Sequence, residues 1–234
     1  MKKILIIAFS FCLFGQMAFA QKKSKKDYVV TLKTNFGDMH LILFDDTPLH
    51  KANFLKLVND KFYDGLLFHR IIDGFMIQGG DPDSKNAQPG QHLGAGGGNL
   101  ERIPFEFKPN HVHKKGALAA ARDGNPEKKS SACQFYIVQG KAMSDDQITA
   151  TAARNKMTYS TKQRSDYMIL GGTPFLDNNY TVFGEAIDNL ELIDKIAKQP
   201  KDASDRPTAD IKMSMTVEKM RKKKITKKYG YKYE

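Results

Sequence analysis

Apolar and polar positions alternate in short runs along most of the chain, and this pattern predicts a protein built mainly of β-strands. Residues 28–44, YVVTLKTNFGDMHLILF, are expected to form two strands joined at residues 35–37, because Met39, Leu41 and Leu43 alternate with polar neighbours. The other predicted strands are apolar runs bounded by turn residues, at 66–82 (two short strands broken near residues 73–74), 116–122, 133–139, 180–187 and 211–220.

Two segments carry a helical pattern instead. Thr47 and Pro48 give the start signal of a helix, with threonine as N-cap and proline at the first helical position, and its apolar stripe ends near Asn59. A second amphipathic helix is predicted over 189–198. Many short strands with two helices far apart in the sequence favour a closed, mainly antiparallel β-barrel.

Two polar stretches interrupt this pattern. Residues 81–99 are rich in glycine, and their GAGGGN run has no following Gly-Lys-Ser/Thr, so a flexible surface loop is expected in place of a phosphate-binding loop. Residues 141–173 are polar and rich in alanine, with one helix expected from about Asp146 to Lys156. This segment is predicted to be a surface insertion without a core of its own.

The first twenty residues have the features of a secretory signal. Two lysines precede an apolar run, and a small-x-small site at residues 18–20 ends the segment. A transmembrane anchor needs about 20 apolar residues, and Gly15 and Gln16 interrupt the run before that length is reached. We therefore expect export, with the periplasm as the destination, and no transmembrane anchor.

The remaining chain is divided by its charge. Residues 21–27 are expected to be a basic linker, 28–220 one domain, and 221–234 a basic C-terminal tail. Lysine and arginine concentrate at these two ends of a chain whose net charge is +11, and such runs are typical of solvated tails. Binding of nucleic acid or of an anionic membrane surface is the alternative, and export disfavours nucleic acid.

A single cysteine, Cys133, remains once the signal segment is removed, so the mature chain cannot form an internal disulfide. Its surroundings, ACQFYIV, are apolar, which favours a small buried side chain over a nucleophile. A chain of this length can build a stable core without such cross-links. We expect the protein to be a monomer.

The stretch LLFHRIIDGFMIQGGDP (66–82) places polar side chains, Arg70 and Gln78 among them, within an apolar run. Its residues 68–81 resemble the signature of the cyclophilins, the peptidyl-prolyl cis–trans isomerases. GALAAAR, SACQFYIV and FLDNNYTVFGEAIDNLELIDKI follow in the order found in that family. The resemblance covers 28–220 apart from the insertion and some loops. It implies a closed eight-stranded antiparallel barrel capped by two helices, with an active groove on its outer face.

The resemblance also implies roles for individual residues. Arg70 is expected to be catalytic, with His69 as a supporting neighbour. The walls and rim of a pocket for the substrate proline ring are expected from apolar and aromatic side chains: Phe75, Met76, Tyr136, Leu176, Phe175 and Tyr180. Gln78 and Gln134 are expected to hold the peptide backbone and to position Arg70. The backbone at Ala121 and Arg122 is expected to pair with the peptide as an added strand.

The chemistry of proline isomerisation suits an arginine. An X–Pro amide rotates over a barrier of about 20 kcal/mol, because its nitrogen lone pair is shared with the carbonyl. In the twisted transition state the lone pair localises on nitrogen and can accept a hydrogen bond, so a guanidinium there stabilises the transition state selectively. This reaction needs no nucleophile, metal or cofactor, and none is expected. His111 and His113 have a spacing that a strand could use for a metal, but no third ligand lies nearby in the sequence.

Two departures from the family pattern matter for the pocket. Phe175 stands where many members have tryptophan, and it lacks the indole N–H donor, so tight binding of cyclosporin is not expected. Tyr136 stands where phenylalanine is usual, and its hydroxyl needs a partner. The alternative function is a proline-peptide binding module or chaperone that uses the same groove without catalysis.

Overall fold

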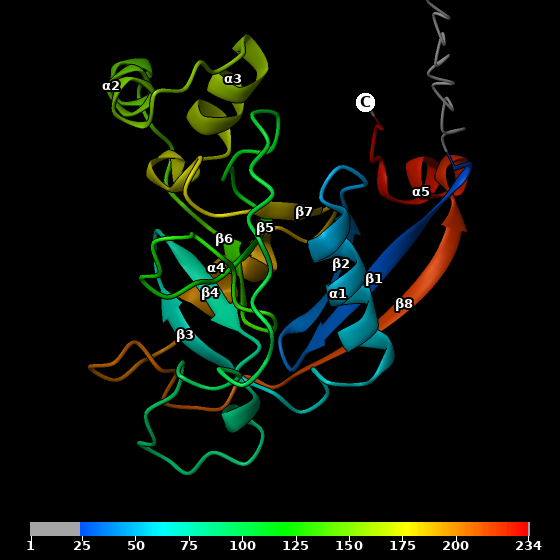
Figure 1. Cartoon of the computed structure of the whole chain (residues 1–234), viewed down its shortest axis with the longest axis vertical. Coiled ribbons are helices and arrows are strands. Elements are labelled where there is room, and N and C mark those ends of the chain that lie inside the picture. The colour runs from blue at the N-terminus through cyan, green and yellow to red at the C-terminus, as the bar shows by residue number, and fades with distance from the viewer. Residues whose placement is uncertain (1–23, 234) are drawn as a thin grey trace, which may run out of the picture.

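The computed structural model describes residues 24–233 and contains one eight-stranded antiparallel sheet that curls around an apolar core (Figure 1). The expected signal segment, residues 1–20, lies outside the described residues. Every predicted strand is confirmed. The strands are β1 (Lys26–Thr34), β2 (Gly37–Leu43), β3 (Phe68–Ile72), β4 (Met76–Gly79), β5 (Ala117–Ala120), β6 (Phe135–Val138), β7 (Val182–Ala186) and β8 (Met213–Arg221). Their order in the sheet is β3-β4-β6-β5-β7-β2-β1-β8.

The two edges of the sheet, β3 and β8, meet over a short seam. An isolated bridge joins Leu67 to Lys212. The amide of Phe68 donates to the carbonyl of Ile211 at 2.9 Å, and the amide of Gly65 donates to that of Met213 at 2.8 Å. The expected closed barrel is thus corrected to a curled sheet, because its edges share this seam and not a continuous strand ladder.

The two predicted helices, α1 (Pro48–Asn59) and α4 (Glu191–Ala197), are confirmed. Thr47 occupies the N-cap position of α1, but its hydroxyl makes no capping bond to the helix. Glu106 takes that function, because its carboxylate accepts the amide of Leu49 at 3.1 Å and the amide of His50 at 3.0 Å. A distant acidic residue therefore satisfies the free amides at the start of α1.

The inner face of the sheet forms the main core. Alternate strand residues point inward and pack with α1 and α4, and they include Leu32, Leu41, Phe68, Ile71, Ile77, Leu118, Phe135, Ile137 and Phe183. Phe54 of α1 meets the rings of Phe135 and Phe183 at centroid distances of 5.7 and 5.3 Å. Cys133 belongs to this core with 2% of its surface exposed, and burial raises the pKa of its thiol. The prediction of a buried cysteine is confirmed.

The insertion contains two helices, α2 (Asp145–Asn155) and α3 (Thr161–Ile169), where one was expected. Each begins with a serine capping box, formed by Ser144 and Ser160 with the glutamine three residues later. The helices enclose a small apolar cluster of Val112, Ile148, Tyr159 and Tyr167. The expectation that this segment lacks a core of its own is therefore wrong.

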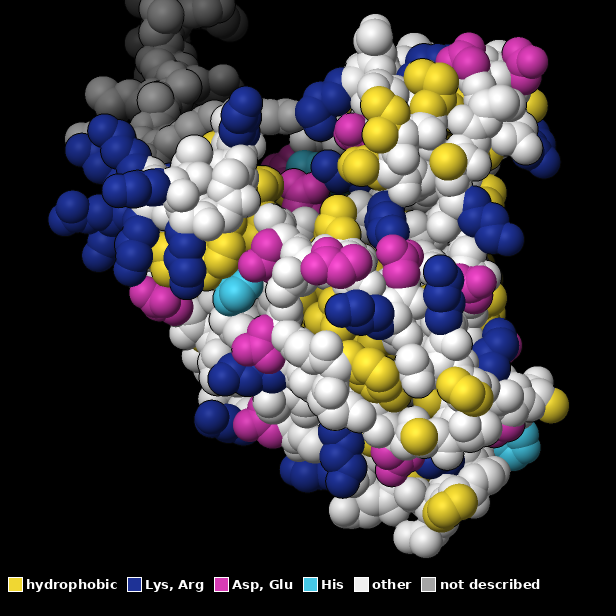
Figure 2. All heavy atoms as spheres, turned by 180° about the vertical axis from the view of Figure 1, so that it is seen from behind, with side chains coloured by type: hydrophobic (Ala, Val, Ile, Leu, Met, Phe, Trp, Pro, Cys, Tyr) yellow, Lys and Arg dark blue, Asp and Glu magenta, His cyan; other side chains and the backbone are white. Residues whose placement is uncertain are grey.

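The C-terminal segment also differs from its prediction. Residues expected to form a solvated tail form helix α5 (Lys222–Tyr229), whose Ile225 is fully buried against Val29, Ile42 and Met220. One isoleucine and the tyrosines that follow it give the segment an inner face, while its lysines point outward, at the left of Figure 2. The expected linker is shorter as well, because β1 begins at Lys26. Within residues 24–233, no helix is long and apolar enough to cross a bilayer.

Candidate active site

Arg70, Gln78, Tyr136 and Ala119 lie in one row across four adjacent strands. Arg70 of β3 pairs with Gln78 of β4, Gln78 pairs with Tyr136 of β6, and Tyr136 pairs with Ala119 of β5. Directly paired residues of antiparallel strands share a face. This row therefore lies on the outer face of the sheet, opposite the main core.

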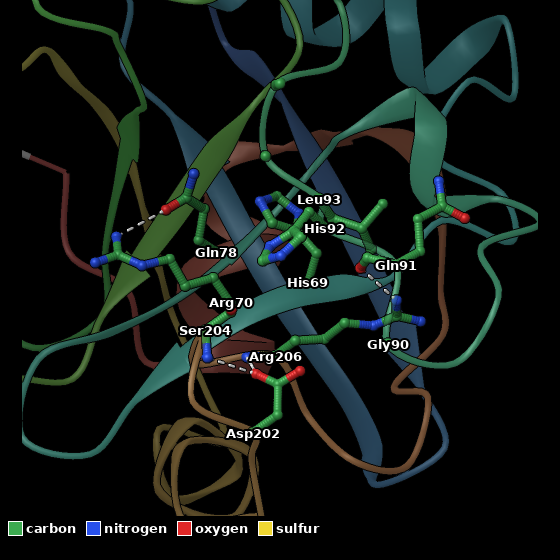
Figure 3. Close-up of a pocket in the computed structure, with 12 residues that line it drawn as sticks. His69, Arg70, Gln78, Gly90, Gln91, His92, Leu93, Asp202, Ser204 and Arg206 are labelled. Carbon is green, nitrogen blue, oxygen red and sulfur yellow. Dashed lines mark hydrogen bonds between the residues drawn. The ribbon is translucent and has the colours of Figure 1, made fainter.

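A β-bulge at His69 gives Arg70 its outward direction. Phe68 pairs with Gly79 and Arg70 pairs with Gln78, so two steps along β3 match one step along β4. Without the bulge, Phe68 and Arg70 would share a face, because side chains of a strand alternate with period two. Phe68 instead lies in the inner core, and the Arg70 side chain extends toward Gln78 and away from the His69 ring (Figure 3). The sequence predicted the arginine but not this irregularity.

A chain of side-chain amides leads from Arg70 to the glycine-rich loop. Arg70 Nη1 donates to Gln78 Oε1 at 3.3 Å, and Gln78 Nε2 donates to Gln134 Oε1 at 3.1 Å. Gln134 Nε2 in turn donates to the carbonyls of Gly94 and Gly96, at 2.9 and 3.0 Å. Arg70 Nε also lies 3.8 Å from the carboxylate of Asp205, and 42% of the Arg70 side chain is exposed to a ligand.

The glycine-rich loop is fixed to the site, which corrects the expectation of a flexible surface loop. Besides the two bonds from Gln134, the amide of Gly94 donates to the buried carboxylate of Asp81. A Cβ at Gly96 would collide with the same carboxylate, and Gly97 has φ of +81° beside the sulfur of Cys133. Glycine is required here for close approach, not for mobility.

The apolar residues expected to form the proline pocket lie together on the outer face. Met76 and Tyr136 are buried, and Phe75, Leu176 and Tyr180 pack against them half-buried. The small side chains of Ala117, Ala119 and Ala121 belong to the same cluster. At the rim, the exposed ring of Phe175 stacks on Phe75 at 5.7 Å, and Tyr180 meets Tyr136 edge-on at 6.0 Å.

Fewer backbone groups are free to pair with an added strand than expected. The amide of Ala121 donates to the carbonyl of Gln134 at 3.0 Å, and the carbonyl of Ala121 accepts the amide of Ser131 at 2.8 Å. Both groups of Ala121 are thus engaged. Among the described residues, no hydrogen bond engages the backbone of Arg122, whose guanidinium lies over the ring of Tyr180 at 4.7 Å. The peptide-pairing expectation therefore rests on Arg122.

The Tyr136 hydroxyl has a partner that the sequence analysis did not identify. It lies 2.9 Å from Nε2 of His113, whose Nδ1 lies 2.6 Å from the carboxylate of Asp177. His113 and Asp177 are 0% and 1% exposed. The signal in the sequence was the hydroxyl itself, because a buried hydroxyl requires a polar neighbour. Only the fold shows which histidine supplies it.

A hollow of about 360 Å³, whose lining includes no residue of the apolar cluster, adjoins Arg70 (Figure 3). His69, Arg70, Gln78 and Arg206 contribute to its lining, together with residues 90–95. His69 is 3% exposed and, within the described residues, neither of its ring nitrogens has a hydrogen-bond partner. Burial lowers its pKa to about 4, so the ring is neutral at neutral pH.

The two histidines considered as metal ligands each form a hydrogen bond with a carboxylate. His111 Nε2 lies 2.6 Å from Asp46, and its ring stacks on Phe44 at 3.8 Å. His113 belongs to the contacts described above. Within residues 24–233, no group of three or more histidine, cysteine, aspartate or glutamate side chains is arranged to hold a metal ion.

A curled eight-stranded sheet with an arginine beside an outer apolar cluster defines a class of protein, and comparison with known proteins identifies it. The profile of the family described as cyclophilin type peptidyl-prolyl cis-trans isomerase/CLD matches residues 29–218. The chain belongs to this family, and it is a peptidyl-prolyl cis–trans isomerase that acts on proline-containing peptides.

Several relatives support this assignment. A protein of Streptococcus pyogenes serotype M6 named as a bifunctional phosphatase/peptidyl-prolyl cis-trans isomerase is 39% identical over 187 residues, which cover 78% of this chain and 37% of that one. The chain thus spans about a third of that relative. A Staphylococcus haemolyticus protein named as a peptidyl-prolyl cis-trans isomerase is 35% identical over 78% of this chain and 86% of its own. The crystal structure of a Cryptosporidium parvum cyclophilin covers 82% of this chain and 98% of its own, with 26% identity and a TM-score of 0.60.

Proposed function

We propose that Arg70 catalyses the isomerisation by donating a hydrogen bond to the proline nitrogen as the amide twists. The observation that carries this proposal is the chain from Arg70 through Gln78 to Gln134, which holds the guanidinium beside the apolar cluster. A donor fixed in advance stabilises developing electron density without a reorganisation cost, and one such donor is worth about 3–4 kcal/mol.

The proline ring is bound in the cluster of Phe75, Met76, Tyr136 and Leu176, with Phe175 and Tyr180 at its rim. Apolar packing of the ring there orients the X–Pro bond toward Arg70, which supplies the remaining rate acceleration through positioning. The peptide backbone is held by Gln78, Gln134 and the backbone of Arg122. The reaction requires no cofactor and no metal.

The substrates are proline-containing segments of exported proteins, whose folding the enzyme assists in the periplasm as a monomer. The signal-like pattern of residues 1–20 supports export. N-terminal sequencing of the protein recovered from the periplasmic fraction tests this. The expected first residue is Gln21, and an uncleaved chain in the cytoplasm contradicts export.

Measurement of cis-to-trans exchange in a short X–Pro peptide tests the catalytic role. Arg70→Ala is expected to lower kcat/KM by about 10²- to 10³-fold, the usual loss of one preorganised donor, with the fold intact. Arg221→Ala is the control, because Arg221 is exposed at the far end of β8. Equal activity of Arg70→Ala and wild type would refute the role of Arg70. A wild-type protein that binds the peptide without accelerating exchange would favour the binding module.

A further inference from the structure

The insertion at 141–173 is connected to the pocket by buried hydrogen bonds. The hydroxyl of Tyr159, which precedes α3, donates to Asp177 Oδ2 at 2.7 Å. The hydroxyl of Tyr167 within α3 donates to the same oxygen at 2.5 Å. Asp177 lies directly after the turn that carries Phe175 and Leu176, the pocket residues. Two residues of the insertion thus donate hydrogen bonds to the carboxylate that holds His113 against Tyr136.

We propose that the insertion is a positioning element of the proline pocket, acting from Tyr159 and Tyr167 through Asp177 and His113 on Tyr136. This inference rests on the proposed role of Tyr136 as a wall of that pocket. Asp177, His113, Tyr159 and Tyr167 are positioning residues, because the apolar cluster separates them from the place of the proline ring.

Every hydrogen bond in this network pairs one donor with one acceptor. Asp177 accepts four bonds, two on each oxygen, from the amide and Nδ1 of His113 and from the two tyrosine hydroxyls. Burial, and after it the charge of Asp177, raises the pKa of both tyrosines, so they keep their protons and donate. A carboxylate with all its lone pairs satisfied tolerates burial without further partners.

This arrangement gives the Tyr136 hydroxyl a direction. In the tautomer whose Nδ1 donates to Asp177, Nε2 of His113 is the acceptor and the Tyr136 hydroxyl is the donor. Its hydrogen then points toward His113 and away from the pocket. Burial raises the pKa of Tyr136, which keeps the hydroxyl protonated. The pocket accordingly presents the face of the Tyr136 ring to a proline, and the ring is fixed at its far end.

The insertion also holds the pocket rim. Asn155, the last residue of α2, donates from Nδ2 to the carbonyl of Pro174 at 2.7 Å. Pro174 begins the 3-10 turn η2 (Pro174–Leu176) that includes Phe175. A segment that was needed only for its own folding would not require hydrogen bonds both to Pro174 at the rim and to the carboxylate of Asp177 behind Tyr136.

The test is a comparison of three tyrosine-to-phenylalanine variants in steady-state kinetics on an X–Pro peptide. Tyr167→Phe and Tyr159→Phe each remove one hydroxyl and no ring. We expect KM to rise about three- to tenfold for Tyr167→Phe, and less for Tyr159→Phe, while kcat stays within about twofold, since network couplings of this kind change affinities by such factors. Tyr63→Phe is the matched control, because Tyr63 is equally buried and its hydroxyl donates to the carbonyl of Cys133 in the main core.

A double-mutant cycle separates positioning from stability alone. Tyr136→Phe removes the hydroxyl at the end of the network, so Tyr167→Phe added to it is expected to change KM by less than about twofold. Labelling of tyrosine Cζ with ¹³C adds a direct signature, because Tyr167→Phe is expected to shift the Tyr136 resonance while Tyr63→Phe leaves it unchanged. Tyr159→Phe supplies the same comparisons if Tyr167→Phe does not fold.

Three results would overturn the proposal: an unchanged KM in both insertion variants, an equal rise in KM with Tyr63→Phe, or the same rise in both Tyr136 backgrounds. These results are distinct from a failure of the pocket assignment. That failure would appear as a normal KM in Tyr136→Ala, with activity still dependent on Arg70.

Discussion

The two faces of β6 show how one strand serves two purposes. Phe135 points inward and is surrounded by other apolar rings, while its neighbour Tyr136 points outward, where its ring meets apolar groups and its hydroxyl meets His113. The inner side chains are held by close packing, which gives stability without directional bonds. The outer ones are held by hydrogen bonds that define where a guanidinium or a ring must lie. If the outer face carries the proposed catalysis, stability and catalysis are therefore separable in this sheet.

Truncation of the inner face is expected to give the largest change in stability. Phe135→Ala removes a ring that is 1% exposed and leaves a cavity, so the free energy of unfolding should fall by about 3–5 kcal/mol. Urea denaturation measures this loss, and the folded fraction should retain its kcat/KM. A loss below about 1 kcal/mol, or a loss of activity in the folded protein, would contradict the separation of the two faces.

The bulge residue, His69, should make the stability of the protein depend on pH. The folded-state pKa of His69 is about 4, below the value of about 6.5 in an unfolded chain, so the unfolded state takes up the proton first. The contribution of His69 to the free energy of unfolding is therefore complete above pH 6.5 and is lost as the pH falls toward 4. The loss is at most about 3 kcal/mol, at 1.36 kcal/mol per pKa unit. Urea unfolding of wild type and His69→Leu from pH 7 to 4 measures it. Parallel curves for the two proteins would contradict this prediction.

Loss of an outer-face hydrogen bond is expected to have the smallest effect on stability and a visible one on activity. Gln134→Ala releases both Gln78 and the carbonyls of Gly94 and Gly96. The free energy of unfolding should fall by about 1–2 kcal/mol, the value of a lost buried bond, while kcat/KM falls about tenfold because Arg70 is less fixed. Gln139→Ala is the control, since its buried amide bonds the turn at Asp73 and Gly74 and not Arg70. Equal losses of activity would argue against the chain from Arg70 to Gln134.

Much of this architecture follows from local patterns. The alternation around Met39 and the Thr47–Pro48 start signal depend on neighbours in the sequence, so strands and helices could be predicted. The apolar residues of the pocket came from a family motif and do lie together. The insertion was predicted, but its core was not, because Tyr159 and Tyr167 are separated by a polar helix start that conceals their shared partner.

The features that could not be predicted from the sequence depend on contacts between residues far apart in the chain. The cap from Glu106 joins residues more than fifty positions apart, and the two bonds from Gln134 to the glycine-rich loop span about forty. Helix α5 was missed because Ile225 is one apolar residue among many lysines, and its burial requires the outer side of β1 and β2. In each case a polar or charged segment is fixed by a partner that no local pattern indicates.

The bulge at His69 makes β3 a strand with two phases. Residues before it follow one alternation of inside and outside, and residues after it follow the opposite one, so one unpaired residue acts as a phase shift in the strand. Deletion of that single position would give a regular ladder with Phe68 inside and Arg70 still outside, whereas straightening of the bulge with His69 retained would turn Arg70 to the face of Phe68. An enzyme of this kind could thus lose the outward direction of Arg70 through a change of register in β3 that leaves every side chain in the sequence, whereas a deletion at the bulge would preserve that direction.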